Sequence, residues 1–286
     1  MFLRLQAYHR PQSVAEALKL RQQPNARFIA GGTALAGGVD DATETLIDLS
    51  LLDLRYIRQA GEAVALGATT TLADLVSSPE VKAVGGGIIG AVALQTGSLA
   101  LQTRATLGGI LATAGEGEEL LAALLALNAS VVTVRGASAQ VREDWDLATF
   151  VNRRHEILDA ALIVEVQLPV VAVATAVERV ARTPRDLPVV AIVAACRFQG
   201  GRVDAVRLAA TGLAPLPQRL EAAERICNGT NLTDTVVDRA VTAVQESIAP
   251  PDDIRGQADY RRYLARVLVR RALVRLVQAS AGTGKE

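Results

Sequence analysis

The sequence contains few of the residues that carry metal, thiol and acid–base chemistry. Its 286 residues include two cysteines, Cys196 and Cys227, and two histidines, His9 and His155. Two thiols cannot supply the four ligands of an iron–sulfur cluster or a structural zinc site within one chain. Two histidines leave little for a histidine-rich metal centre or a Ser-His-Asp triad. We therefore expect no metal site and no catalytic residue here, and a cofactor or a partner chain that supplies the chemistry.

Aromatic side chains and net charge are equally scarce. Aromatics make up 3% of the chain, and 30 Lys and Arg balance 30 Asp and Glu. Few stacking side chains argue against a single-stranded nucleic-acid platform, and zero net charge argues against a strongly basic DNA-binding protein. No apolar run reaches the ~20 residues that span a bilayer, and the start, Met1-Phe2-Leu3-Arg4, does not resemble a signal peptide. We expect a cytoplasmic protein that binds neither nucleic acid nor membrane.

The length and the hydrophobic pattern predict two domains, at roughly 150 residues each. Short strands and helices alternate before Pro169, whereas three strands and then three helices follow it. The three strands are expected at 172–180, 189–198 and 203–210, and the helices at about 217–227, 233–247 and 259–279. We predict an α+β protein with a first domain at 1–170 (a small lobe at about 1–55 and a larger lobe at about 56–170), a second domain at 171–280, and a disordered tail at 281–286.

A glycine-rich segment follows a predicted strand near the N-terminus. Ser13 and Glu16 form a capping box for a short helix, and residues 27–30 then form a strand that leads into Gly31-Gly32-Thr33. Together with a strand at 45–49, this arrangement is a small β–α–β unit. Glycine admits positive φ, so successive N–H groups can converge on an anion. The segment matches neither the Walker pattern nor the dinucleotide fingerprint, so a plain tight turn and a phosphate site both remain open.

A second glycine segment, Thr103-Arg104-Ala105-Thr106-Leu107-Gly108-Gly109-Ile110, is expected to be a loop before a helix at about 118–127. Acidic residues crowd the first turn of that helix, where they suit the helix dipole. A carboxylate there could accept hydrogen bonds from ribose or ribityl hydroxyls, and Arg104 could reach a pyrophosphate. Taken alone, this segment can equally be structural.

The two segments, in this order and about 75 residues apart, resemble those of the FAD-binding medium subunit of molybdenum hydroxylases, the family of carbon monoxide dehydrogenase and xanthine dehydrogenase flavoprotein subunits. Each stretch is a weak signal, but their collinearity over nearly the whole chain is strong. The stretches that carry the resemblance are Ala7-Tyr8-His9-Arg10-Pro11 with Ser13-Val14-Ala15-Glu16-Ala17-Leu18, Ala30-Gly31-Gly32-Thr33-Ala34-Leu35, Leu46-Ile47-Asp48-Leu49-Ser50, Leu66-Gly67-Ala68-Thr69-Thr70-Thr71-Leu72-Ala73-Asp74-Leu75, Arg104-Ala105-Thr106-Leu107-Gly108-Gly109 and the arginine-rich helix from Tyr260 to Leu276.

The resemblance implies a fold and a role. The fold is a two-part FAD-binding domain of the vanillyl-alcohol-oxidase (PCMH) type, followed by a C-terminal domain of antiparallel sheet and helices. The role is that of a subunit in a dimer of heterotrimers. A large partner subunit would hold the molybdenum cofactor, a small one two [2Fe–2S] clusters, and FAD in this chain would pass their electrons to NAD, oxygen or a quinone.

The resemblance also assigns the cofactor-binding residues. The first segment would hold the pyrophosphate through backbone N–H groups, and the second would line the other side of the FAD. A stretch of the second domain, residues 178–188, resembles a family segment beside the flavin. The residues implied are Ala30, Gly31, Gly32, Thr33, Ala34, Leu35, Arg104, Thr106, Gly108, Gly109, Ile110, Glu119, Arg179 and Asp186.

Three of these residues depart from the family pattern. Ile110 stands where the family has Asn after the second Gly-Gly, and a lost hydrogen bond to a buried polar cofactor costs about 1–3 kcal/mol. Glu119 stands in place of Asp, and Arg179 in place of Lys, with its charge kept but not its geometry. Two further hypotheses therefore stay beside the electron-transfer flavoprotein: a family-derived scaffold that has lost productive FAD binding, and a plain nucleotide-binding module.

Other conspicuous residues are interpreted as structural. We expect both histidines and Trp145 to have packing or surface roles, and both cysteines to be small core residues. The arginines of the last helix are expected to form a solvated face, with a docking face for a partner as the alternative: Arg261, Arg262, Arg266, Arg270, Arg271 and Arg275.

Overall fold

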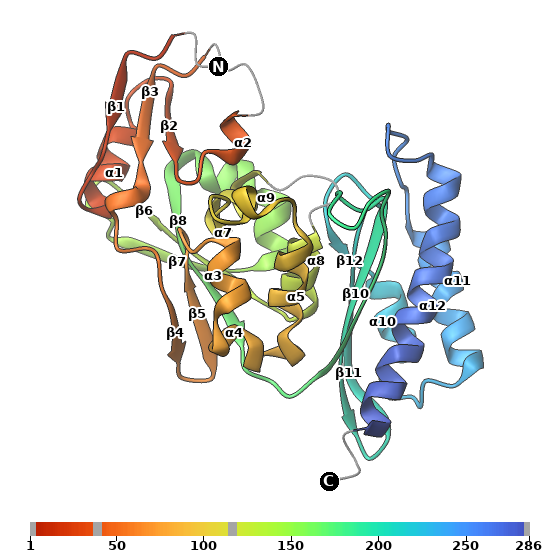
Figure 1. Ribbon diagram of the computed structural model, residues 1–286. Helices are drawn as coiled ribbons and strands as arrows, with labels where there is room; N and C mark the ends of the chain where they lie inside the picture. The colour runs from red at the N-terminus through yellow and green to blue at the C-terminus, as the bar shows by residue number, and fades with distance from the viewer. Residues whose placement is uncertain (1–3, 37–41, 114–118, 283–286) are drawn as a thin grey trace.

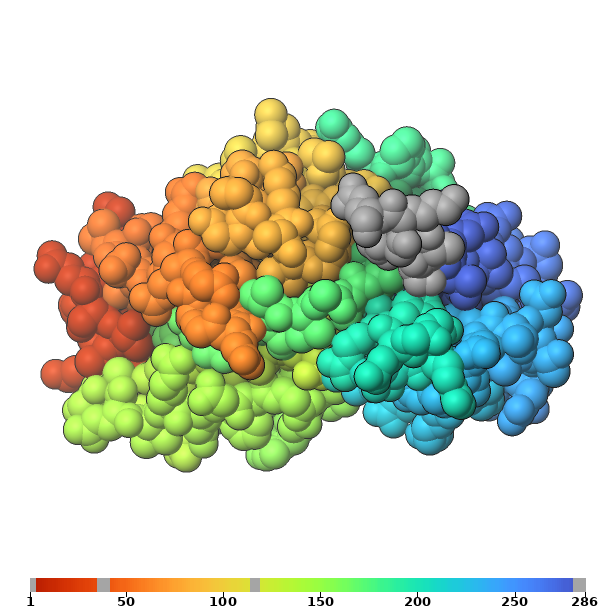
Figure 2. Space-filling view, turned by 90° about the horizontal axis from the view of Figure 1, so that it is seen from below, coloured from red at the N-terminus to blue at the C-terminus, as the bar shows by residue number. Residues whose placement is uncertain are grey.

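The computed structural model describes residues 4–36, 42–113 and 119–282. Its strands form three sheets, which lie in chain order from the N-terminal end of the molecule to the C-terminal end (Figure 1). The space-filling view shows the same order, with the first residues at one end and the last helices at the other (Figure 2). The chain is a mixed helix-and-sheet protein, as predicted.

The N-terminal lobe is built on a three-stranded parallel sheet in the order β1-β3-β2. Its first helix begins where the capping signal predicts. Ser13 Oγ accepts the N–H of Glu16 at 3.1 Å, and the Glu16 carboxylate accepts the N–H of Gln12 at 2.8 Å. The elements of this lobe are β1 (Ala7–His9), α1 (Val14–Arg21), β2 (Ala26–Ile29), α2 (Thr33–Ala36), β3 (Thr45–Asp48) and the 3-10 helix η1 (Leu49–Leu51).

The larger lobe is a five-stranded antiparallel sheet in the order β4-β5-β8-β6-β7, with helices packed against it. β4 and β5 form a hairpin around Gly61, and Thr71 with Asp74 forms the capping box of α3. The elements are β4 (Ile57–Ala60), β5 (Ala63–Gly67), α3 (Leu72–Ser77), α4 (Pro79–Ala83), η2 (Gly85–Gly87), α5 (Ile88–Gln95), α6 (Leu99–Gln102), α7 (Leu107–Thr113), α8 (Glu119–Ala126), β6 (Ser130–Arg135), β7 (Val141–Asp146), α9 (Leu147–Ala160) and β8 (Ala161–Pro169).

The C-terminal part is a four-stranded antiparallel sheet in the order β12-β11-β10-β9. Helices α10 and α12 pack against one face of this sheet, with α11 packed on these two helices, and α8 of the larger lobe packs against the other face (Figure 1). Cys196 and Cys227 are buried in its core, where burial raises their pKa values to about 12 and about 11. The elements are β9 (Ala174–Val180), β10 (Val190–Gln199), β11 (Arg202–Thr211), β12 (Gln218–Arg219), α10 (Glu221–Cys227), α11 (Asp234–Ser247) and α12 (Ala258–Gly282).

Several elements differ from the sequence prediction. The sequence gives no sign of the edge strand β7, nor of the extent of the helix α9 that follows it. The helix expected from about residue 217 begins at Glu221, because Gln218 and Arg219 pair with β11 instead. Helix α12 extends through Gly282, so the predicted tail at 281–286 lies largely outside the described residues. The domain limits 1–170 and 171–280 stay a prediction.

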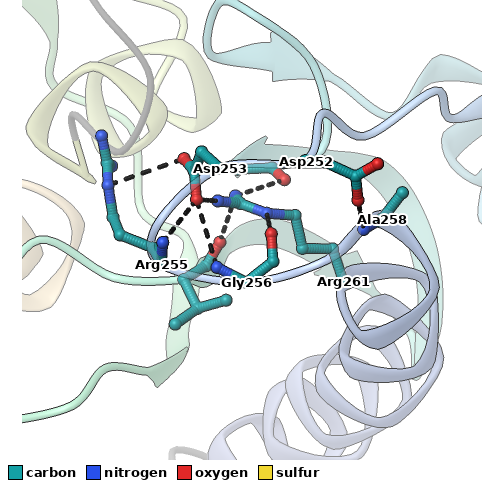
Figure 3. Close-up of polar contacts among 8 residues, drawn as sticks. Asp252, Asp253, Arg255, Gly256, Ala258 and Arg261 are labelled. Atoms are coloured by element: carbon teal, nitrogen blue, oxygen red, sulfur yellow. Dashed lines mark hydrogen bonds and ion pairs between the residues drawn. The ribbon is translucent and has the colours of Figure 1, made fainter.

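One arginine of the last helix is not on a solvated face. Arg261 is fully buried, and its guanidinium donates to the carbonyls of Val189 at 2.7 Å and Gly212 at 2.9 Å and to Asp253 Oδ1 at 2.6 Å. Figure 3 shows this cluster, in which Asp253 also accepts the N–H groups of Arg255 and Gly256. Arg261 thus ties α12 to the start of β10 and the end of β11.

Across residues 4–36, 42–113 and 119–282, no helix combines the length and the apolar character that crossing a membrane requires.

Candidate functional site

The first glycine segment, residues 30–35, joins β2 to the short helix α2. β2 ends at Ile29 beside β3, and Gly32 then adopts a φ of +72°, a conformation that favours glycine. The backbone N–H groups of Gly31, Gly32 and Thr33 have no acceptor among the described residues. Three successive amide donors are therefore available just after the end of β2.

The second glycine segment, residues 103–110, is not the loop that the sequence predicts. Residues 105–108 run antiparallel to residues 68–72, with the N–H of Leu107 bonded to the Thr70 carbonyl at 2.9 Å and that of Gly108 to the Ala68 carbonyl at 2.7 Å. Helix α7 begins at Leu107, so the two glycines lie in its first turn. Thr106 Oγ1 accepts the N–H of Gly109 at 3.3 Å. The glycine pair thus lies in the first turn of α7, where the N–H groups of Leu107, Gly108 and Gly109 already have acceptors within the protein.

The two segments touch each other through their backbones. A Cβ atom at Gly31 would lie 1.7 Å from the carbonyl oxygen of Arg104, far inside any allowed contact. Arg104 Nε in turn donates to the Gly31 carbonyl at 3.4 Å. Gly31 is therefore required for the close approach of the two segments, whatever its N–H group binds.

A cavity of about 640 Å³ opens beside this contact. Its volume falls within the ~300–1,000 Å³ typical of small-molecule sites. Helices α7 and α9 and the start of β8 contribute further walls, and the connection between β9 and β10 contributes Arg185 and Leu187. The predicted residues that line the cavity are Ala30, Gly31, Gly32, Thr33, Ala34, Thr106, Gly108, Gly109 and Ile110.

The charged lining of the cavity is mostly basic. Four arginines, one acidic residue (Asp159) and His155 line the described part of the cavity. An excess of guanidinium groups favours a phosphorylated or otherwise anionic ligand. Sequence reasoning missed these residues for different reasons: the extent of helix α9 was not recognised, and Arg185 is distant in the chain. Arg21 and Arg27 stand shortly before the first glycine segment, but nothing in their local pattern indicates a binding role. The four arginines are Arg21, Arg27, Arg154 and Arg185.

Five of the predicted residues do not line the cavity. Arg104 bonds to the first segment from outside, and Leu35 lies in α2. The other three form a separate group, in which Arg179 Nε lies 3.1 Å from Glu119 Oε2 and another nitrogen of Arg179 bonds to the Asp186 carbonyl at 2.6 Å. Two of the three departures from the family pattern, Glu119 and Arg179, are thus paired with each other. Glu116 and Glu118 lie outside the described residues.

The ion pair of Glu119 and Arg179 is almost completely excluded from solvent. The side chains of Glu119 and Arg179 are 5% and 16% exposed, and Glu119 Oε1 has no hydrogen-bond partner in the described structure. Burial raises the pKa of the Glu119 carboxyl, although Arg179 lowers it. Because desolvation outweighs the attraction of the neighbouring cation, the pair fixes geometry more than it adds stability.

Two family models cover most of the chain. Residues 3–171 match the FAD binding domain in molybdopterin dehydrogenase, and residues 175–276 match the CO dehydrogenase flavoprotein C-terminal domain.

Similar proteins match over nearly the whole length of both chains. The carbon monoxide dehydrogenase medium chain of Hydrogenophaga pseudoflava is 31% identical over 93% of this chain and 95% of its own. The glyceraldehyde dehydrogenase medium chain of Sulfolobus acidocaldarius is 26% identical over 93% and 96%. Among solved structures, a carbon monoxide dehydrogenase from Hydrogenophaga pseudoflava superposes with a TM-score of 0.87 at 29% identity, covering 98% of this chain and 99% of that one. Quinoline 2-oxidoreductase from Pseudomonas putida 86 gives 0.85 at 25% identity, with 97% and 98% covered.

These matches and the cavity geometry lead to one conclusion. The chain belongs to the family of medium, FAD-binding flavoprotein subunits of molybdenum hydroxylase-type dehydrogenases.

Proposed function

We propose that this chain binds FAD in the 640 Å³ cavity and passes electrons from the [2Fe–2S] clusters of a partner subunit to an external acceptor. One observation carries the proposal: two glycine segments, distant in sequence, meet in backbone contact and line one cavity. FAD, when bound, supplies the chemistry, because it accepts electrons singly from clusters and releases them in pairs. The chain itself binds and orients the cofactor.

The residues present fit FAD. Gly31, Gly32 and Thr33 offer three backbone donors that lack acceptors in the described residues, as a diphosphate requires. Gly109 lines the cavity at the start of α7. A Cβ atom there would lie 2.9 Å from Thr106 Oγ1, closer than a real Cβ contact, so glycine keeps this part of the lining free of a side chain. The arginines of the cavity offset the charge of the phosphates. Arg21 and Arg27 belong to the N-terminal lobe and Arg185 to the connection between β9 and β10, so positive charge lines the cavity from both of these parts of the chain.

Partner subunits supply the remaining centres in this proposal. Within the described residues, no group of three or more His, Cys, Asp or Glu could hold a metal ion. The molybdenum cofactor is assigned to a large partner subunit and the two [2Fe–2S] clusters to a small one, in a dimer of heterotrimers. A cytoplasmic location remains a prediction.

A second candidate function, that of a scaffold without bound FAD, is favoured by the side chain of Ile110. Ile110 lines the cavity with an alkyl side chain at a position where the family pattern has an amide. A chain in which this wall excludes FAD would act as a scaffold for its partners.

The first test is a titration of the purified, flavin-free chain with FAD, followed by the quenching of flavin fluorescence. ADP and FMN compete as controls, which separates a flavin site from a plain nucleotide site. Saturable binding of FAD that ADP displaces only weakly supports the proposal. If the chain does not bind FAD, either alone or after assembly with its partners, the proposed function is refuted and the scaffold role is favoured.

The electron-transfer role needs the assembled complex. A tagged chain should co-purify with subunits that contain molybdenum and iron. Removal of FAD from that complex should leave the clusters reducible but stop transfer to the external acceptor, and added FAD should restore it. Transfer that persists without FAD would contradict this role.

A further inference from the structure

The connection between β9 and β10, residues 181–189, supplies the part of the cavity wall that belongs to the C-terminal part of the chain. Arg185 and Leu187 of this connection line the cavity, although both side chains are exposed and belong to no helix or strand. An exposed connection has many conformations open to it, and ordering it costs entropy. Its position at the cavity therefore needs specific contacts.

Arg179 supplies those contacts on both sides of Arg185. Its NH1 group donates to the Pro184 carbonyl at 2.8 Å, and its NH2 group to the Asp186 carbonyl at 2.6 Å. The residues immediately before and after Arg185 are thus held by one guanidinium. The planar fork of arginine can serve these two acceptors and a carboxylate at once, which the compact ammonium of lysine cannot match in geometry.

Glu119 fixes the arginine in turn. Its Oε2 accepts from Arg179 Nε at 3.1 Å, and it lies in the first turn of α8, a helix of the larger lobe. The pair therefore connects the larger lobe to the C-terminal sheet directly behind the cavity wall. Neither Glu119 nor Arg179 lines the cavity, so neither is placed to touch a bound ligand.

The far end of the same connection is also anchored. The N–H of Val189 donates to the Val180 carbonyl at 2.7 Å, which closes the base of the connection. The Val189 carbonyl accepts from the buried Arg261, whose partners include Asp253 (Figure 3). Only the stretch around Arg185 then depends on the pair of Glu119 and Arg179.

We propose that Glu119 and Arg179 are positioning residues that hold the 184–186 backbone so that the Arg185 side chain contacts the FAD bound in the cavity. Arg185 is then a cofactor-binding residue, and Arg179 acts through it. This inference rests on the proposed function, since it takes FAD as the occupant. Glu119 and Arg179, which both depart from the family pattern, then act together to position one backbone segment, and neither represents a lost contact with FAD.

The order of the connection can be measured without the cofactor. Trypsin should cut the bond after Arg182 slowly in the flavin-free wild-type chain and at least tenfold faster in Arg179→Met, with the cleavage site identified by mass spectrometry. Arg219→Met is the matched control, because Arg219 also pairs with a buried carboxylate, Glu224, but does not line the cavity or bond to this connection. Equal cleavage after Arg182 in Arg179→Met and wild type would overturn the inference.

The contact with FAD is tested by affinity. Arg185→Gln and Arg179→Met should each raise the Kd for FAD about tenfold, as expected for the loss of a hydrogen bond to a charged group. The double variant should be no weaker than the weaker single variant, because Arg179 acts only through Arg185. Arg179→Lys should bind FAD less well than wild type, and Arg219→Met should bind it equally.

The outcomes separate this inference from the proposed function. If wild type does not bind FAD, the proposed function fails, and the trypsin comparison still tests the positioning by itself. If wild type binds FAD and Arg185→Gln binds it equally well, the inference fails alone. Fully additive effects of Arg179→Met and Arg185→Gln would also overturn it, because they would indicate two independent contacts.

Discussion

The contact between the two glycine segments makes a sharp prediction for Gly31→Ala. The new Cβ would lie 1.7 Å from the Arg104 carbonyl oxygen and 2.6 Å from its carbonyl carbon, and both are backbone atoms that cannot rotate away. Non-bonded heavy atoms prefer about 3.5 Å, so the two segments would have to move apart by roughly 1.8 Å.

This separation changes both stability and binding. Overpacking of this kind costs about 1–3 kcal/mol of unfolding free energy. A preformed site tolerates displacements of only about 0.5 Å, so the Kd for FAD should rise between roughly 10- and 100-fold. Urea unfolding and FAD titration of the purified chain measure the two effects.

Gly90→Ala is the matched control. Gly90 lies inside helix α5, and a Cβ there would meet its nearest atom, the Leu75 carbonyl oxygen, at an ordinary 3.4 Å. Alanine is a better helix former than glycine by about 1 kcal/mol, so this variant should be as stable as wild type or more so. If Gly31→Ala keeps wild-type stability and FAD affinity, the close approach of the segments does not build the site, and the reasoning is wrong.

Three further changes test separate parts of the structure. Ile110→Asn should tighten FAD binding about tenfold by restoring an amide to the cavity wall, with Ile110→Leu unchanged; an unaltered Kd would favour the scaffold. Because burial raises the pKa of Glu119 above its ordinary value of about 4.5, the folded state favours its protonated form. The unfolding free energy of wild type relative to Glu119→Gln should thus be highest below pH 4.5 and fall as pH rises through the raised pKa of Glu119. Urea unfolding at several pH values measures both free energies, and a wild-type advantage that grows with pH would contradict the prediction. Arg261→Met should lower the unfolding free energy by about 3–5 kcal/mol, because it removes the donor of three carbonyls and one of the partners of Asp253. The exposed Arg266→Met should stay within about 0.5 kcal/mol of wild type.

Local signals in the sequence were sufficient for the elements that depend on neighbours in the chain. Ser13 and Thr71 cap helices because their hydroxyls accept N–H groups three residues further on. Gly61, with a φ of +60°, lies in the turn that joins β4 to β5 in a hairpin. Resemblance then supplied what local patterns cannot, namely that two glycine segments about 75 residues apart belong to one site.

Elements stabilised by distant contacts were missed. β7 reads Val-Arg-Glu-Asp-Trp-Asp and is an edge strand, so charged side chains can face water along it and no apolar alternation marks it. Arg154 could not be connected to the cavity without the helix that carries it. Arg185 lies on an irregular connection, and its place at the cavity depends on Arg179 and Glu119. The buried Arg261 resembles its exposed neighbours in sequence, because only tertiary structure surrounds it with acceptors.

The positions of the three departures change how each weighs against FAD binding. Glu119 and Arg179 satisfy each other behind the cavity wall, and their exchange of Asp and Lys for longer or planar groups is a matched pair of changes. Such a pair alters how a wall is held, not which atoms it presents to a ligand. Ile110 alone replaces a polar group in the lining itself. The choice between an electron-transfer subunit and a scaffold therefore depends on one alkyl side chain, and on whether nearby backbone donors and arginines compensate for the amide it lacks.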